Sequence, residues 1–206
     1  MNPEASGEVS RARDNDIFKR SWKELAYHAQ LLDLMKIDVS TKIQVHVGGV
    51  YGDKVRSMKR FVRRFFLLEN QIRRRLVIEN DDRLFNLQDC IRIGSETKLP
   101  VLFDVFHHRI NGKGETVKKA VCLSRKTWNE KKDGAPMVDY SFKRICGSGR
   151  QHAESIDICR FEDSLKESSP VDFDVMLEIK DKEKSALRAV KAASHDPRFL
   201  KAMENK

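Results

Sequence analysis

Short, almost continuously apolar runs alternate along the chain with longer stretches whose apolar residues recur at helical spacing. The runs, rich in β-branched and aromatic residues, predict strands at 42–49, 75–81, 100–108, 135–141 and 173–180. The amphipathic stretches predict helices at 18–36, 52–72, 86–94, 116–128 and 180–194. We expect Gly94 to end the third of these helices, and the glycine-rich polar segment 147–157 to form a loop.

Strands that alternate with helices indicate parallel βαβ units, and continuous apolar runs are typical of strands that are covered on both faces. The pattern fits a doubly wound sheet and a (β/α)8 barrel alike. In both folds the functional residues gather at the carboxyl ends of the strands. Those ends are therefore where chemistry is expected.

Each predicted strand brings a histidine or a carboxylate to its carboxyl end or to the loop beyond it. These residues are His46, Glu79, Asp104, His107, Asp139, His152 and Glu178. One such residue alone is more often a turn or capping residue, so it is the recurrence that favours a shared site. Mixed imidazole and carboxylate ligands suit divalent metals such as Mn²⁺, Zn²⁺ or Fe²⁺. Carboxylates gathered in one pocket repel unless they are protonated or bound to cations, so we predict a multi-metal centre that acts on a phosphate ester.

Composition adds a class of partner to this picture. The chain has 206 residues and a net charge of +9, and its 40% of hydrophobic residues suffice for the core of one domain. The positive charge favours a polyanionic partner, nucleic acid first. No apolar run approaches the ~18 residues of a membrane span, and the first residues lack a signal-peptide pattern. We therefore expect an intracellular, cytoplasmic protein without a membrane partner, whose scattered cysteines are reduced.

A basic stretch follows the first predicted strand. It contains Lys54, Arg56, Lys59, Arg60, Arg63 and Arg64. Most of these charges are expected to form the solvated face of a helix. Lys54 is the exception, because it follows the segment GGVYGD at a loop-to-helix junction where a bound phosphate can reach it. His108, beside His107 on a backbone expected to be extended, should point away from the predicted centre.

Several segments, in this order along the chain, resemble the UV damage endonuclease family of DNA repair enzymes: VHVGGVYGDK, LVIENDD, PVLFDVFHH, MVDYS, GRQHAESID and VMLEIKDKEK. The resemblance implies an α/β fold, an incomplete TIM (β/α)8-type barrel with about five of the eight βα units present. It also implies a metal-dependent endonuclease with Mn²⁺ as cofactor, which cuts double-stranded DNA immediately 5′ of UV photoproducts. The matching positions give as metal ligands His46, Glu79, Asp104, His107, Asp139, His152 and Glu178.

Roles within the implied centre can be assigned to individual residues. We expect Glu79, Glu178 and Lys54 to take part in catalysis, and Glu79 to bridge two metals. Asp104 would share a second metal with Glu178. The outer metal would be held by His107 and His152.

The chain departs from the family pattern at two positions and at its start. Asp139 stands where many members have a histidine, and Met137 stands where many have a lysine near the metals. The family's first strands supply two further histidine ligands and a Gln-Tyr pair that probes the damaged bases, and they have no counterpart here. We therefore expect an N-terminally truncated enzyme, a single partial barrel domain over 1–206 with a flexible segment 1–16 and exposed sheet edges.

Alternatives remain open. An abasic-site endonuclease or a metal-dependent sugar isomerase of similar barrel type would use the same kinds of ligand. An inactive fragment would bind DNA only through its basic surface, in a salt-sensitive way and without preference for irradiated DNA. The sequence leaves the oligomeric state open.

Overall fold

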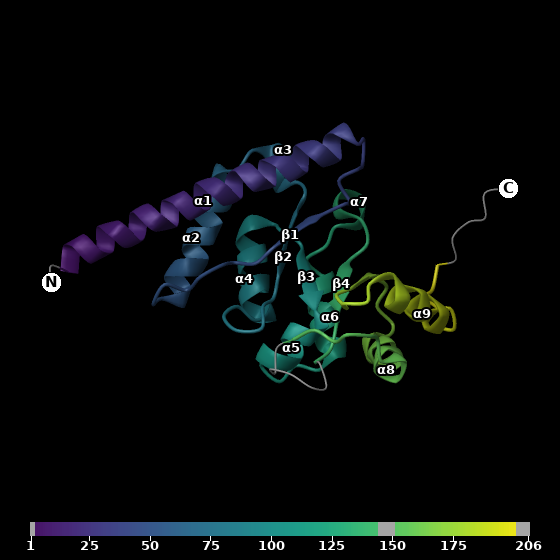
Figure 1. Cartoon of the computed structure of the whole chain (residues 1–206). Helices are drawn as coiled ribbons and strands as arrows, with labels where there is room; N and C mark the ends of the chain where they lie inside the picture. Colours follow the sequence, from purple (N-terminus) through teal and green to yellow (C-terminus); the bar gives the residue numbers. More distant parts are fainter. Residues whose placement is uncertain (1–2, 144–150, 201–206) are drawn as a thin grey trace.

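The computed structural model describes residues 3–143 and 151–200, with side chains described from residue 15 onward. Within this part of the chain the strands form one parallel sheet in the order β1-β2-β3-β4-β5 (Figure 1). Its strands are β1 Ile43–Val45, β2 Leu76–Glu79, β3 Val101–Asp104, β4 Met137–Tyr140 and β5 Asp174–Leu177. The spatial order follows the chain order without a reversal, which is the winding of a barrel and not of a doubly wound sheet. The curled sheet confirms the predicted incomplete α/β barrel, with β1 and β5 at its two described edges.

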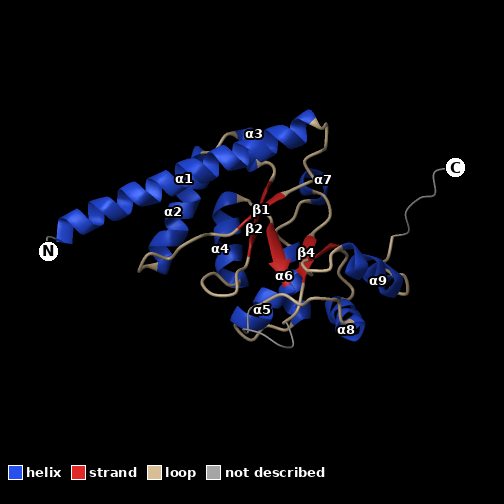
Figure 2. Cartoon of the chain, in the orientation of Figure 1, coloured by secondary structure: helices blue, strands red, loops and turns tan. Residues whose placement is uncertain are grey.

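Helices connect the strands and cover the outer face of the sheet (Figure 2). They are α1 Pro3–Leu34, α2 Lys54–Leu67, α3 Asn70–Arg73, α4 Leu87–Thr97, α5 Val105–Asn111, α6 Val117–Arg125, α7 Glu130–Asp133, α8 Ile158–Ser168 and α9 Glu183–Ala193. Along the outside, α2, α4, α6, α8 and α9 pack each against the next. The long α1 crosses α3 and β1 and projects beyond the sheet (Figure 1). None of the described helices is both long and apolar enough to span a membrane.

The two faces of the sheet have different environments because successive strand residues point to opposite sides. Outward-facing residues join the main core beneath the helices, among them Leu76, Ile78, Val101, Phe103, Val138 and Tyr140. The inner face carries a smaller apolar cluster of Val77, Leu102 and Trp128, with Met137 packed against it. Glu79, Asp104 and Asp139 each follow one of the cluster's strand residues by two positions. These three carboxylates therefore lie on an apolar floor at the carboxyl ends of the strands.

Arg75 fixes the approach of α1 to the first strand. Its side chain is 2% exposed. Its guanidinium donates to Asp33 Oδ1 from Nε and Nη2, and to the backbone oxygens of Ile37, Asp38 and Thr41 from Nη1 and Nη2. A buried guanidinium is tolerated because these partners satisfy its donors. The contacts join the end of α1 and the α1–β1 connection to the start of β2.

Several predicted boundaries were wrong, and the largest error concerns the segment 100–108. It forms a strand only as far as Asp104, and Val105 begins α5. The Asp104 carboxylate accepts a hydrogen bond from the backbone N–H of His107 at 2.6 Å and so caps the helix. The Asp104 cap therefore ends the strand and starts the helix. The apolar run continues across this boundary, which is why the sequence pattern predicted a longer strand.

Helix boundaries also differ from the predictions. Gly94 does not end α4, which continues to Thr97 and closes at Lys98 with a φ of 62°. A Cβ on Gly94 would lie 2.9 Å from the Leu99 carbonyl oxygen, so glycine is needed there for close packing. The helix predicted over 52–72 is two helices, interrupted at Leu68 and Glu69, whose backbones are extended. The predicted helix 18–36 begins at Pro3, inside the segment 1–16 whose flexibility stays a prediction.

Besides α5, which was predicted as strand, the short α7 and the longer α8 were not predicted. For α8 the reason is clear. Its buried face contains two serines beside Phe161, so the apolar periodicity is weak. The first part of the loop predicted at 147–157 lies outside the described residues, as does Cys146. Among the described residues, Cys90, Cys122 and Cys159 are free thiols.

Candidate metal centre

Glu79, at the end of β2, is the residue on which the centre converges. Its Oε2 lies 3.0 Å from Nε2 of His46, which directly follows β1. Its Oε1 lies 3.2 Å from Nδ1 of His107, in the first turn of α5. Glu79 is only 3% exposed, whereas the His46 side chain is 46% exposed. Both oxygens of this buried carboxylate are therefore held by imidazoles, at a site that opens to solvent at His46.

Two further carboxylates stand beside Glu79. Asp104 ends β3 and Asp139 lies opposite it in the register of β4, and both are fully buried. Oδ2 of Asp104 and Oδ1 of Asp139 have no hydrogen-bond partner among the described residues. Nδ1 of His107 lies 3.6 Å from the Asp104 oxygen, beyond hydrogen-bond distance. A buried carboxylate oxygen without a hydrogen bond is costly in a protein interior, and it is an available ligand for a cation. These two oxygens favour metal binding at the ends of β3 and β4.

Ligand atoms from these residues fall into two compact groups. Those of His46, Glu79 and His107 lie within 4.8 Å of one another, and so do those of Glu79, Asp104 and Asp139. Glu79 belongs to both groups. The imidazole and carboxylate donors fit a borderline divalent metal such as Mn²⁺, Fe²⁺ or Zn²⁺, and the shared carboxylate fits a centre of more than one ion.

The ionisation of the metal-free chain reflects this crowding. Burial raises the pKa of Asp104 to about 7 and that of Asp139 to about 8, because a charged carboxylate loses its hydration. Burial also works against the charge of Glu79, but hydrogen bonds from His107 and His46 outweigh it and lower the pKa. For the same reason the contact with Glu79 raises the pKa of His46. Burial opposes a charged His107, but the Glu79 hydrogen bond and the Asp104 charge raise its pKa to about 9. In the absence of a cation, protons on Asp104, Asp139 and His107 thus reduce the negative charge of the buried carboxylates.

His152 and Glu178 form a pair next to these groups. His152 Nδ1 lies 2.9 Å from Ser141 Oγ and 3.8 Å from Glu178 Oε2. The His152 and His107 rings are 6.3 Å apart between centroids. Both side chains of the pair are about one-third exposed, at 33% and 30%. They are thus near the buried groups without belonging to either of them.

Lys54 lies apart from these residues. It is the first residue of α2, and its Nζ is 2.5 Å from Oδ2 of Asp89 and 5.5 Å from the centre of the Phe85 ring. Asp89 belongs to the capping box of α4. Lys54 therefore links two helix starts at the strand-end side of the sheet, and its catalytic role stays a prediction.

His108 is not part of the centre, but the reason given from the sequence was wrong. It lies on the helix α5, not on an extended backbone. Its ring is buried, stacks edge-on with Phe103 and places Nε2 2.9 Å from the Glu115 carbonyl oxygen. The helical turn, not strand alternation, separates it from His107.

Sequence reasoning missed one residue of the centre. Gln44, on β1 two residues before His46, places its Nε2 3.2 Å from Glu79 Oε2 and 3.1 Å from Asp139 Oδ2. Strand alternation places Gln44 on the inner face of the sheet. An uncharged amide inside a strand does not by itself indicate a functional site, so Gln44 was not selected. Met137, the other departure from the family pattern, packs into the apolar floor.

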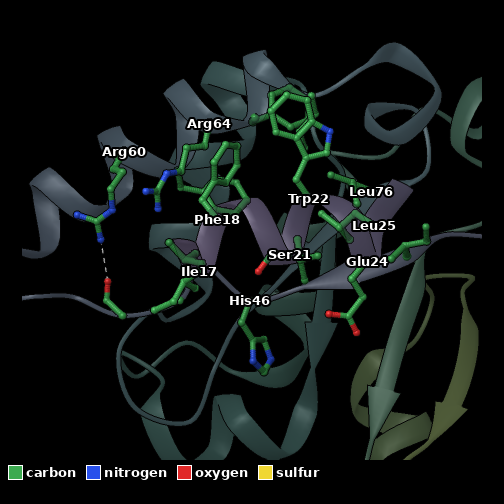
Figure 3. A pocket seen from close by; sticks show the side chains of 18 of the residues that line it. Ile17, Phe18, Ser21, Trp22, Glu24, Leu25, His46, Arg60, Arg64 and Leu76 are labelled. Atoms are coloured by element: carbon green, nitrogen blue, oxygen red, sulfur yellow. Dashed lines mark hydrogen bonds between the residues drawn. The ribbon is translucent and has the colours of Figure 1, made fainter. Parts of the chain in front are cut away.

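A cavity of about 500 Å³ lies between α1, α2 and the edge strand β1 and reaches Gln44 and His46. Figure 3 shows Phe18, Trp22 and Leu25 of α1 on one side, and Arg60 and Arg64 of α2 on another. Nη2 of Arg60 donates to the Gly49 carbonyl oxygen at 3.1 Å. The lining is mainly apolar and aromatic, so the cavity differs in character from the carboxylate groups that it adjoins.

Comparison with known proteins places this geometry in a family. The family model of the UV-endonuclease UvdE matches residues 8–202. The UV DNA damage endonuclease of Clostridium perfringens is 40% identical over 179 residues, which are 85% of this chain and 43% of the relative. That of Bacillus mycoides is 31% identical over 169 residues, 81% of this chain and 53% of the relative. This chain thus spans about half the length of these relatives.

A solved structure gives the same result. The crystal structure of SacUVDE matches with a TM-score of 0.83 and 41% sequence identity, over 90% of this chain and 61% of that chain. The matched region includes almost all of the described fold. Sequence and structure agree that this chain belongs to the UV-endonuclease UvdE family.

Proposed function

We propose that this chain holds divalent metal, Mn²⁺ first, for the hydrolysis of DNA immediately 5′ of a UV photoproduct. Membership of the UvdE family supports the reaction class. The observation that supports the site most strongly is the carboxylate of Glu79, which is shared by two groups of ligand atoms and touched by His46 and His107.

The protein residues would act by holding and orienting. Glu79, Asp104 and Asp139 would supply oxygens to the metals, and His46 and His107 would supply nitrogens. His152 and Glu178 would complete the set from the more exposed side. Cations bound here would supply an activated water and offset the charge of the phosphodiester. The apolar floor beneath the carboxylates would keep bulk water out and strengthen each electrostatic contact.

The proposed substrate is double-stranded DNA, whose backbone phosphates would meet the positive charge of this chain. Arg56, Lys59 and Arg63 are exposed along α2. Lys54, the first residue of that helix, would hold a phosphate together with the first turn. These contacts would set affinity and its dependence on salt, not the choice of lesion.

The truncation expected from the sequence belongs to this proposal. The coding sequence upstream of Met1 tests it directly. An in-frame extension that encodes histidine-containing strands would support the truncation. A stop codon in frame just upstream, with no such extension, would contradict it.

The activity can be tested with supercoiled plasmid, irradiated or not, in the presence of Mn²⁺. We compare the wild-type chain, Glu79→Gln, and the control Glu96→Gln, which makes the same change at an exposed position of α4. We expect nicking of irradiated plasmid by the wild type and by the control. Loss of the shared ligand should lower the rate by at least about 100-fold.

Three outcomes would count against the proposal. Nicking that ignores irradiation would contradict the lesion preference, and equal nicking by Glu79→Gln would contradict the site. A folded wild-type chain that binds irradiated and unirradiated DNA alike, without cleaving either, would support the inactive DNA-binding alternative.

A further inference from the structure

The edge strand β1 contributes a side chain that links two carboxylates from different strands. The Nε2 atom of Gln44 lies within hydrogen-bond distance of both Glu79 on β2 and Asp139 on β4. A side-chain amide nitrogen carries two protons. Gln44 can therefore donate one to each carboxylate, and no donor capacity is left over.

For Asp139 this contact is the main restraint. Among the described residues, Gln44 is the one hydrogen-bond donor to the Asp139 carboxylate, and it binds only Oδ2. Oδ1 is left buried and without a partner. Glu79 differs, because both its oxygens are also contacted by imidazoles. Removal of the amide should thus release Asp139 more than Glu79.

The chemistry of an amide suits this place. A lysine or arginine at position 44 would also bind two carboxylates, but its positive charge would repel a metal ion and compete for the same oxygens. An apolar residue would leave two buried carboxylates with one partner fewer each. A neutral donor orients the carboxylates and leaves their negative charge for a cation.

We propose that Gln44 is a positioning residue of the metal centre, which holds the Glu79 and Asp139 carboxylates in the arrangement that binds the cation. The inference rests on the proposed metal site. It assigns to the edge strand a part in metal affinity that goes beyond the ligand His46. Partners of this kind, which orient metal ligands, typically change metal affinity by about 10- to 100-fold when they are removed.

The test is a titration of the purified metal-free chain with Mn²⁺, followed by the electron paramagnetic resonance signal of the free ion. Gln44→Met removes the amide at similar volume, and Gln44→Asn keeps an amide that is too short to reach both carboxylates. The control is Gln88→Leu, which removes a comparable amide-to-carboxylate hydrogen bond, from Gln88 to Glu115, on an exposed surface. We expect both Gln44 variants to bind Mn²⁺ about 10- to 100-fold more weakly than the wild type, and the control to match it.

A double-mutant cycle shows whether Gln44 acts through Asp139. In an Asp139→Asn background, Gln44→Met should weaken Mn²⁺ binding far less than it does alone. Thermal unfolding of each metal-free variant shows that it is folded, and if Gln44→Met does not fold, Gln44→Asn carries the comparison. A folded Gln44 variant with wild-type affinity, or equal effects in both backgrounds, would overturn the inference. A wild-type chain that binds no Mn²⁺ would instead overturn the proposed metal site.

Discussion

Nδ1 of His107 lies 3.2 Å from Oε1 of Glu79, although the two residues belong to successive βα units. The contact depends on the early start of α5, which turns His107 back over the end of β2. Its Nδ1 also lies 3.0 Å from the Asn80 carbonyl oxygen. The Nδ1 edge of the ring thus faces a carboxylate and a backbone carbonyl, and Nε2 makes neither contact.

The stability of the metal-free chain should fall as the pH rises from about 5 to about 9. Asp104 and Asp139, with pKa values of about 7 and 8 against a usual 3.8, keep a proton in the folded state that the unfolded state has released. His107, with a pKa of about 9 against a usual 6.5, does the same at higher pH. In each case the folded state binds more protons, so the free energy of unfolding decreases with pH.

Urea denaturation across this pH range measures the effect. The loss should be on the order of a few kcal/mol. Mn²⁺ should stabilise the chain increasingly as the pH rises, because its binding displaces these protons. A free energy of unfolding that rises with pH in the metal-free chain would contradict the assignment of these groups.

Asp139→Asn should stabilise the metal-free chain while it weakens metal binding. Near pH 9 the wild-type Asp139 is largely ionised, with a pKa of about 8, and its buried charge has no counter-ion. Asparagine removes that cost and keeps an oxygen that can accept from Gln44. Near pH 5 the wild-type carboxyl is already protonated, so the gain should be small there. Thermal melts at both pH values measure the gain in stability, and a Mn²⁺ titration measures the loss of metal affinity. An equal gain in stability at pH 5 and pH 9 would contradict the assignment of Asp139 as a buried ionisable group.

Arg75→Lys should destabilise the fold by about 3 kcal/mol, because an ammonium cannot satisfy the acceptors that the buried guanidinium binds. The matched control is Arg74→Lys, next to it in the chain. Arg74 also contacts Asp33, at 2.8 Å, but its side chain is 42% exposed. Arg74→Lys should therefore lower the free energy of unfolding by less than about 1 kcal/mol. Urea denaturation of both variants checks the contrast, and similar values would show that burial is not what makes Arg75 important.

Lys54→Gln should lower the rate of nicking of irradiated DNA by about 10-fold at limiting substrate, through the loss of one phosphate contact. Its Mn²⁺ affinity should be unchanged, because Nζ binds Asp89 and not the metal-ligand groups. Lys191→Gln, which makes the same change at an exposed position of α9, is the control. If Lys54→Gln matched the control in nicking, the role of Lys54 would be confined to joining α2 to α4.

Strand alternation and the carboxyl-end rule were enough to predict which side chains the structure brings together at the strand ends. His46, Glu79, Asp104 and Asp139 are close together because they end neighbouring parallel strands, which a sequence pattern can reveal. His107 lies beside Glu79, although it was expected on an extended backbone, since an apolar run continues across the strand-to-helix boundary that the Asp104 cap creates. Gln44 could not be selected, because its role depends on a distance across the sheet and not on residue type. The helix α8 was not predicted because serines on its buried face weaken the apolar periodicity.

Glu79 is the proposed link between the two groups of metal ligands. Crystals of the metal-free chain soaked in MnCl₂, with diffraction recorded at the manganese absorption edge, test this claim most directly. We predict anomalous density bonded to the Glu79 carboxylate, with His46, His107, Asp104 or Asp139 as further ligands, and its loss in Glu79→Gln. Density that appears only at other sites, or that remains unchanged in Glu79→Gln, would contradict the account.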